Sequence, residues 1–157
     1  MRFKQTILML VLLLTFFSCD DNYVSSIPSY PVSLQLNLLT GQYVTFRNST
    51  NEYLLFEKPI VVTDRIGFGG ILVYTGISLD DSNNTIYYAF DLACPYEAKS
   101  NIKVSPVKDA LGQVKCSVCG SVYDVGFGLG NPIEGPSKEI LKRYKTSFSG
   151  DVLYIYR

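Results

Sequence analysis

The sequence of 157 residues contains no histidine and no tryptophan, and its 14 Lys and Arg residues balance its 14 Asp and Glu residues. The absence of histidine excludes a Ser-His-Asp triad, a histidine general base and every histidine-ligated metal or haem site. A formal net charge of zero argues against nucleic-acid binding, which depends on an excess of positive charge. No set of residues typical of a catalytic acid, base or nucleophile stands out, so we do not expect an enzyme on its own.

The amino-terminal end has the composition of an export signal. Arg2 and Lys4 precede the apolar run Thr6–Phe17, whose 12 residues are too few to cross a bilayer, for which about 20 are needed. A basic region followed by a short apolar region predicts a secretory signal peptide over residues 1–18. Cys19 directly afterwards resembles the cysteine of a bacterial lipobox, whose sulfur is acylated after cleavage. Ordinary secretion with an unmodified Cys19 is the alternative.

Lipidation would set the location of the protein. Acyl chains on Cys19 would fix the domain to a membrane surface, and residues 19–30, acidic at their start and otherwise polar, then indicate a short tether. We therefore expect a lipid-anchored protein of the cell envelope, in the periplasm or on the outer-membrane surface, where disulfides persist. There is no internal repeat and no further linker, so residues 31–157 are expected to form one domain.

The remaining residues have the composition of a β-rich domain. Apolar residues make up 47% of the chain and charged residues 18%, enough to bury a sizeable core, and the 12 tyrosines and nine phenylalanines favour strands. Val32–Leu38 alternates apolar and polar residues without interruption, which is typical of a half-buried strand. Short segments separated by turn residues predict further strands at Tyr43–Arg47, Pro59–Val62, Gly70–Tyr74, Ile86–Asp91, Val104–Val107, Gln113–Lys115, Val122–Val125, Ile140–Thr146 and Val152–Tyr156. We expect an all-β antiparallel sandwich or small barrel.

Three cysteines remain after Cys19, and this odd number is the strongest chemical signal in the sequence. Because three thiols cannot all pair within one chain, at least one is free, bridged to a partner or bound to a metal. Cys94 follows the predicted strand Ile86–Asp91, and Cys116 and Cys119 form a CxxC motif at the end of another. Two cysteine-bearing loops can converge on one metal centre, although disulfide pairing is equally compatible with this spacing.

The residues around these cysteines resemble the Rieske [2Fe-2S] domain family. Tyr87–Tyr96 (YYAFDLACPY) is similar to the strand and first cluster loop, where the family pattern is Cys-x-His. Cys116–Asp124 (CSVCGSVYD) is similar to the second loop, with the pattern Cys-x-x-His-Gly-Ser-x-Tyr-Asp. The run GLGNPIEGPSKEILKRY (128–144) resembles the glycine-rich stretch and Gly-Pro loop that cover a Rieske cluster. The resemblance extends over roughly residues 60–157 and implies a Rieske-like fold with a cofactor between the two loops.

The chain departs from the family at two ligand positions. In a Rieske centre two cysteines hold one iron and two histidines hold the other. Cys94 and Cys116 match the cysteine positions, whereas Tyr96 and Cys119 stand at the histidine positions. The resemblance therefore implies a modified [2Fe-2S] cluster with three cysteine ligands and Tyr96, water or another oxygen as the fourth. A thiolate in place of a neutral imidazole would lower the reduction potential.

Two hydroxyl residues extend the match. Ser121 and Tyr123 correspond to family residues that donate hydrogen bonds to cluster sulfur and ligand sulfur and so tune the potential. Gly-Ser turns and strand tyrosines are also common without any cluster. With a cluster, the resemblance implies electron transfer to a redox protein partner in the envelope.

Two alternatives to the cluster remain open. Three thiolates can hold a structural zinc ion together with a carboxylate such as Glu97 or Asp124, or with a water. In a domain without a metal, Cys116 or Cys119 can form a disulfide with Cys94, stabilising the fold by about 2–4 kcal/mol. In either case the protein is expected to be a Rieske-like binding or scaffold module rather than an electron carrier.

Overall fold

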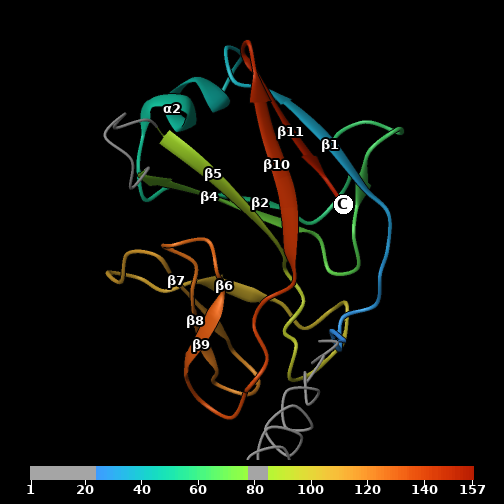
Figure 1. The fold of residues 1–157 in the computed structure, drawn as a ribbon, viewed down its shortest axis with the longest axis vertical. Coiled ribbons are helices and arrows are strands. Elements are labelled where there is room, and N and C mark those ends of the chain that lie inside the picture. Colours follow the sequence, from blue (N-terminus) through green and yellow to red (C-terminus); the bar gives the residue numbers. More distant parts are fainter. Residues whose placement is uncertain (1–23, 78–84) are drawn as a thin grey trace, which may run out of the picture.

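The computed structural model describes residues 24–77 and 85–157, which form a nearly all-β structure (Figure 1). The predicted signal peptide, Cys19 and the first residues of the predicted tether lie outside the described residues. Within the described ranges, no helix is long and apolar enough to cross a membrane. The expectation of an all-β fold is confirmed.

The larger of two sheets has seven antiparallel strands and curls into a nearly closed barrel. Along the sheet the strands lie in the order β2, β4, β5, β10, β11, β1, β3. Their bounds are β1 Val32–Asn37, β2 Tyr53–Phe56, β3 Arg65–Ile66, β4 Ile71–Ile77, β5 Thr85–Asp91, β10 Arg143–Ser149 and β11 Val152–Tyr156. The pairing of β5 with β10 joins the middle of the chain to its carboxyl-terminal hairpin.

The smaller sheet lies below the barrel in Figure 1 and carries both cysteine loops at or near its strand ends. Its four antiparallel strands follow one another in sequence: β6 Val104–Pro106, β7 Gln113–Cys116, β8 Val122–Asp124 and β9 Asn131–Glu134. Because β7 ends at Cys116 and β8 begins just after Ser121, the hairpin between them contains the whole CxxC motif.

The barrel core follows from the alternation of β1. Its residues Val32, Leu34 and Leu36 are buried, while the intervening polar residues face the solvent. They pack with Leu153 and Ile155 of β11, which pairs antiparallel with β1. Each fully buried aliphatic side chain of this kind stabilises the folded state by about 1.5–3 kcal/mol.

A second core joins the barrel to the smaller sheet. Consecutive residues of β4 are buried on both faces, since Leu72 and Tyr74 point toward the smaller sheet while their neighbours face the barrel core. Cys94, Cys116 and Tyr123 belong to this second core. The cysteine loops are therefore fixed against the barrel.

The structure corrects the prediction of a strand at Tyr43–Arg47. Tyr43–Asn48 forms a short helix, α2, whose buried residue is Phe46. Residues three apart share a helix face, and both Tyr43 and Phe46 pack on the barrel core. A strand would instead have placed Tyr43 and Thr45 on one face and Phe46 on the other. The aromatic spacing therefore matches a helix better than the β propensity of the individual residues does.

The prediction of a strand at Pro59–Val62 is also wrong. The backbone N–H groups of Ile60 and Val61 both donate to Asp64 Oδ2, at 2.9 Å each, which folds the segment into a turn. Val62 is 94% exposed at this turn. Three short strands, β2, β3 and β9, were not predicted, while the other predicted segments each overlap an observed strand.

The described part of the predicted tether packs against the domain. Ile27 is only 1% exposed. Lys142 Nζ donates hydrogen bonds to the Ile27 carbonyl at 2.8 Å, to the Pro28 carbonyl at 3.1 Å and to Ser29 Oγ at 3.0 Å. The segment after Val24 thus packs against the folded domain.

Candidate metal centre

The first cysteine loop starts where β5 ends and is closed by backbone hydrogen bonds. Ala93 forms an isolated antiparallel bridge with Lys103. Cys94 N–H donates to the Ile102 carbonyl at 3.0 Å, and the Cys94 carbonyl accepts the N–H of Ala98 at 2.9 Å. Both polar groups of the Cys94 backbone are therefore satisfied, which fixes the direction of its side chain.

The second cysteine loop is the tight connection between β7 and β8. Cys116 N–H donates to the Ser121 carbonyl at 2.9 Å, and Gly120 N–H donates to the Cys116 carbonyl at 3.0 Å. Gly120 has φ +79° with no atom near the position of a Cβ. Its left-handed backbone is the conformation that glycine adopts readily. The turn brings Cys119 back beside Cys116.

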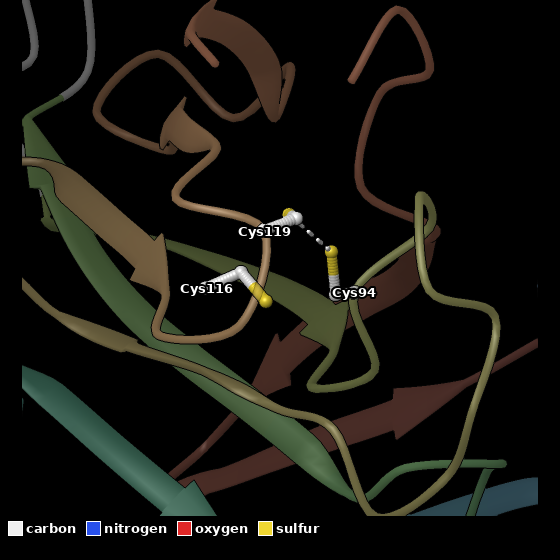
Figure 2. A group of neighbouring side chains, drawn as sticks. All are labelled: Cys94, Cys116 and Cys119. Carbon is white, nitrogen blue, oxygen red and sulfur yellow. Dashed lines mark hydrogen bonds between the residues drawn. The ribbon is translucent and has the colours of Figure 1, made fainter. Parts of the chain in front are cut away.

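The two loops bring their sulfur atoms together, as Figure 2 shows. The sulfurs of Cys94, Cys116 and Cys119 lie within 4.8 Å of one another, and Cys94 Sγ is 3.6 Å from Cys119 Sγ. Cys94 and Cys116 are fully buried, whereas Cys119 is partly exposed. The expectation that the loops converge is confirmed: these three cysteines can hold a metal ion. Thiolate sulfur suits zinc, copper(I) and iron–sulfur centres.

Two buried hydroxyls contact the sulfurs. Tyr123 Oη lies 3.4 Å from Cys94 Sγ, and the Cys119 thiol donates to Ser121 Oγ across 3.3 Å. Ser121 and Tyr123 are both fully buried. An ionised Cys119 would accept a hydrogen bond from the same serine hydroxyl. Both residues that were singled out from the sequence therefore touch the site.

The two closest sulfurs differ in acidity. Burial raises the pKa of the Cys94 thiol to about 11, although the hydrogen bond with Tyr123 works in the opposite direction. Burial also opposes ionisation of Cys119, but hydrogen bonds with Ser121 and with the other two cysteines together outweigh it, so the Cys119 pKa is lowered. Burial and the contact with Cys94 raise the pKa of Tyr123, which keeps its hydroxyl protonated as a donor. Cys119 is thus the sulfur that ionises more readily, beside the protonated Cys94.

The carboxylates considered as fourth ligands are not among the ligand atoms grouped around the sulfurs. Tyr96 shares the first loop with Cys94, but its side chain is 56% exposed. In the described part of the chain, neither Glu97 nor Asp124 belongs to the group of ligand atoms around the sulfurs. Asp124 stands at the opposite end of β8, where its Oδ1 accepts the Gly126 N–H at 2.8 Å. A fourth ligand would therefore come from solvent or from the Tyr96 hydroxyl.

A third loop, Gly135–Glu139, completes the surroundings of the site. We call it the covering loop. Ser137 N–H donates to Ser121 Oγ at 3.0 Å, and Ser137 is 3% exposed. A Cβ on Gly135 would meet Ser121 Cα at 2.5 Å, so glycine permits this close approach. The Gly-Pro sequence gave a signal for the loop, but nothing in the sequence pointed to Ser137.

The geometry defines an all-β protein with a candidate three-cysteine metal centre between two loops and a covering loop. No protein-family model matches the sequence, and no curated protein matches it.

Proposed function

We propose that this protein is an electron carrier of the cell envelope, with a modified [2Fe-2S] cluster bound by Cys94, Cys116 and Cys119 in a Rieske-like domain. The observation that supports this most is the convergence of three thiol sulfurs within 4.8 Å from two separate loops. Thiolates are the usual ligands of iron–sulfur clusters. Water or Tyr96 would supply the fourth ligand, since Tyr96 belongs to the first loop.

The hydroxyl contacts support the same proposal. Tyr123 Oη lies 3.4 Å from Cys94 Sγ, which is the relationship that the Rieske resemblance implies for this tyrosine. Ser121 Oγ lies 3.3 Å from Cys119 Sγ. Hydrogen bonds to ligand sulfur stabilise the reduced, more negative cluster and raise its potential. These hydrogen bonds would partly offset the decrease in reduction potential that a third thiolate ligand causes.

The surface around the sulfurs suits contact with a redox protein. Cys119 is partly exposed, and the two loops present Tyr96 and Val118, which are 56% and 60% exposed. Exposed aromatic and aliphatic side chains of this kind are typical of protein contacts. Electron transfer through Cys119 would then need no opening of the protein. Acylation of Cys19 would hold the carrier at a membrane surface.

Metal and acid-labile sulfide analysis tests the proposal directly. The chain purified without oxygen should contain about two irons and two sulfides and show a visible charge-transfer band that bleaches on reduction. Cys116→Ser should lose the cluster, because it removes a buried ligand. Zinc without sulfide would contradict the electron carrier and indicate a structural metal site instead. A metal-free chain that folds but cannot be reconstituted with iron and sulfide would contradict both.

One observation favours a second candidate. Cys94 Sγ and Cys119 Sγ are 3.6 Å apart, and a small displacement would allow the disulfide bond length of about 2.05 Å. In an oxidising compartment the pair could then tie the two loops together in a binding module without a metal. Mass spectrometry under non-reducing conditions separates the two candidates, since a disulfide lowers the mass by two hydrogens and leaves Cys116 as the one cysteine of the site that can be alkylated after unfolding.

A further inference from the structure

The amino-terminal segment is bound to the domain through the partly exposed carboxylate of Glu139. Ser25 Oγ donates to Glu139 Oε1 at 3.0 Å, and Ser26 N–H donates to the same oxygen at 2.8 Å. Ile27 N–H donates to Ser25 Oγ at 3.2 Å, which folds the segment around the carboxylate. Hydrogen bonds to a charged acceptor are stronger than those between neutral groups.

The same segment is held from its other side by a cation. Lys142 Nζ donates to two backbone carbonyls and to Ser29 Oγ. Ile27 is buried, and it lies in the sequence between the residues that bind Glu139 and those that bind Lys142. We call residues 25–29 the clasp. Glu139 and Lys142 flank Leu141, which is fully buried in the core that contains the cysteines. The clasp therefore joins the amino-terminal segment to the end of the covering loop and to the chain that follows it.

From Glu139 a series of contacts leads to the cysteine site. Ser137 Oγ donates to the Glu139 carbonyl at 3.1 Å, and Ser137 N–H donates to Ser121 Oγ at 3.0 Å. Ser121 Oγ in turn lies 3.3 Å from Cys119 Sγ. Two serines thus separate the residue that binds the clasp from the most exposed sulfur of the site.

We propose that the clasp is a positioning element of the cysteine site and that it acts through Glu139 of the covering loop. By fixing the end of the covering loop, the clasp keeps Ser137 on Ser121 and limits access to Cys119. Release of the clasp lets the covering loop move away and exposes Cys119, while Cys94 stays buried. The clasp begins a few residues after Cys19, so a lipid anchor there would act on the site through it. This role holds whether or not a metal is bound.

Hydrogen exchange and thiol labelling of the full-length protein test this role. In Glu139→Ala, backbone amides of the covering loop should exchange about tenfold faster, as expected for loss of hydrogen bonds to a charged group. In reduced, chelator-treated protein, alkylation of Cys119 by iodoacetamide should accelerate by a similar factor. Glu139→Gln keeps an oxygen acceptor at the same position and should restore both rates to within about twofold of the original protein.

Internal controls separate release of the clasp from general unfolding. Glu134→Ala removes an exposed carboxylate near the same loop without touching the clasp, and both rates should stay unchanged. Alkylation of Cys94 and Cys116 should also remain slow in Glu139→Ala. Equal acceleration of all three cysteines, or unchanged Cys119 labelling despite faster loop exchange, would overturn the proposal. If Glu139→Ala does not fold, Ser25→Ala tests the same contact. Exchange of the covering-loop amides and alkylation of Cys119 should then both accelerate about threefold. No increase in either rate would overturn the proposal.

Discussion

The hydroxyl of Tyr144 donates a hydrogen bond to the Asp91 carboxylate across 2.5 Å in the protein interior. Asp91 is fully buried at the end of β5. Its two oxygens also accept the backbone N–H groups of Phe68 at 2.9 Å, Gly69 at 2.9 Å and Ala93 at 2.8 Å. One carboxylate therefore ties β10, the turn before β4 and the start of the first cysteine loop into a single arrangement.

Removing the hydroxyl of Tyr144 should weaken this arrangement. We expect Tyr144→Phe to lower the free energy of unfolding by about 1.5–3 kcal/mol, because one bond to a charged acceptor is lost while the ring still fills its place. Asp91→Ala should cost more, since it leaves the buried N–H groups of Gly69 and Ala93 without acceptors. Urea unfolding followed by circular dichroism measures both. Equal costs for the two variants would contradict the central role of the carboxylate.

The buried tyrosines should also make the fold sensitive to alkali. Burial raises the pKa of Tyr144 above its ordinary value and that of Tyr74 to about 12. Above about pH 10 the unfolded chain loses these protons while the folded chain keeps them, so stability falls as the pH rises toward the folded pKa values. Each group contributes a slope of up to about 1.4 kcal/mol per pH unit. Unfolding curves from pH 9 to 12 should show a shallower decline for Tyr144→Phe, and an unchanged slope would refute this.

The fold class and the convergence of the cysteines could be predicted because both depend on local patterns. The alternation of Val32–Leu38 indicates a strand that buries one face, and this strand forms as β1. Turn residues after Cys94 and Cys116 place Cys116 at the end of β7 and Cys94 directly after the isolated bridge at Ala93. Turn chemistry and periodicity act over a few residues and can therefore be read directly from the sequence.

The local structure was harder to predict where a single side-chain contact, near or far along the chain, decides it. Asp64 captures two backbone N–H groups of the segment that was predicted as a strand at Pro59–Val62. The predicted tether is held by Glu139 and Lys142, which are more than 100 positions away in the chain. Neither the contacts of Asp64 nor those of Glu139 and Lys142 produce a regular spacing of residue types in the sequence. The clasp and its link to the cysteine site are therefore visible only in the three-dimensional structure.

The proposed cluster leads to a prediction about its potential. Replacing Tyr96 and Cys119 together by histidine should raise the reduction potential by on the order of hundreds of millivolts, because neutral imidazoles would replace an anionic thiolate and an oxygen ligand. A redox titration followed by visible absorption measures the change. Val118→His serves as the control, since it adds an imidazole to the same loop on a side chain that is 60% exposed. Retained iron and sulfide with an unchanged potential in the double variant would exclude Cys119 as a ligand.

The close approach of Gly135 to Ser121 gives a prediction that does not require a metal. Gly135 has φ +86°, and a Cβ there would lie 2.5 Å from Ser121 Cα and 2.8 Å from Ser121 N. Gly135→Ala therefore combines left-handed strain with a clash against rigid backbone, and we expect a loss of about 2–5 kcal/mol in the free energy of unfolding. The covering loop should also move off Ser121, so that Cys119 reacts faster with iodoacetamide.

Gly150→Ala provides the matched control for this substitution. Gly150 also has a left-handed backbone, with φ +61°, but no atom lies within 4 Å of the position of its Cβ. Its cost should be limited to the strain of about 1–2 kcal/mol, with no change in Cys119 reactivity. If both glycine variants lose the same stability and leave Cys119 equally protected, the contact between Gly135 and Ser121 does not hold the covering loop on the site. A larger loss confined to Gly135→Ala would instead show that backbone packing acts together with the clasp to close it.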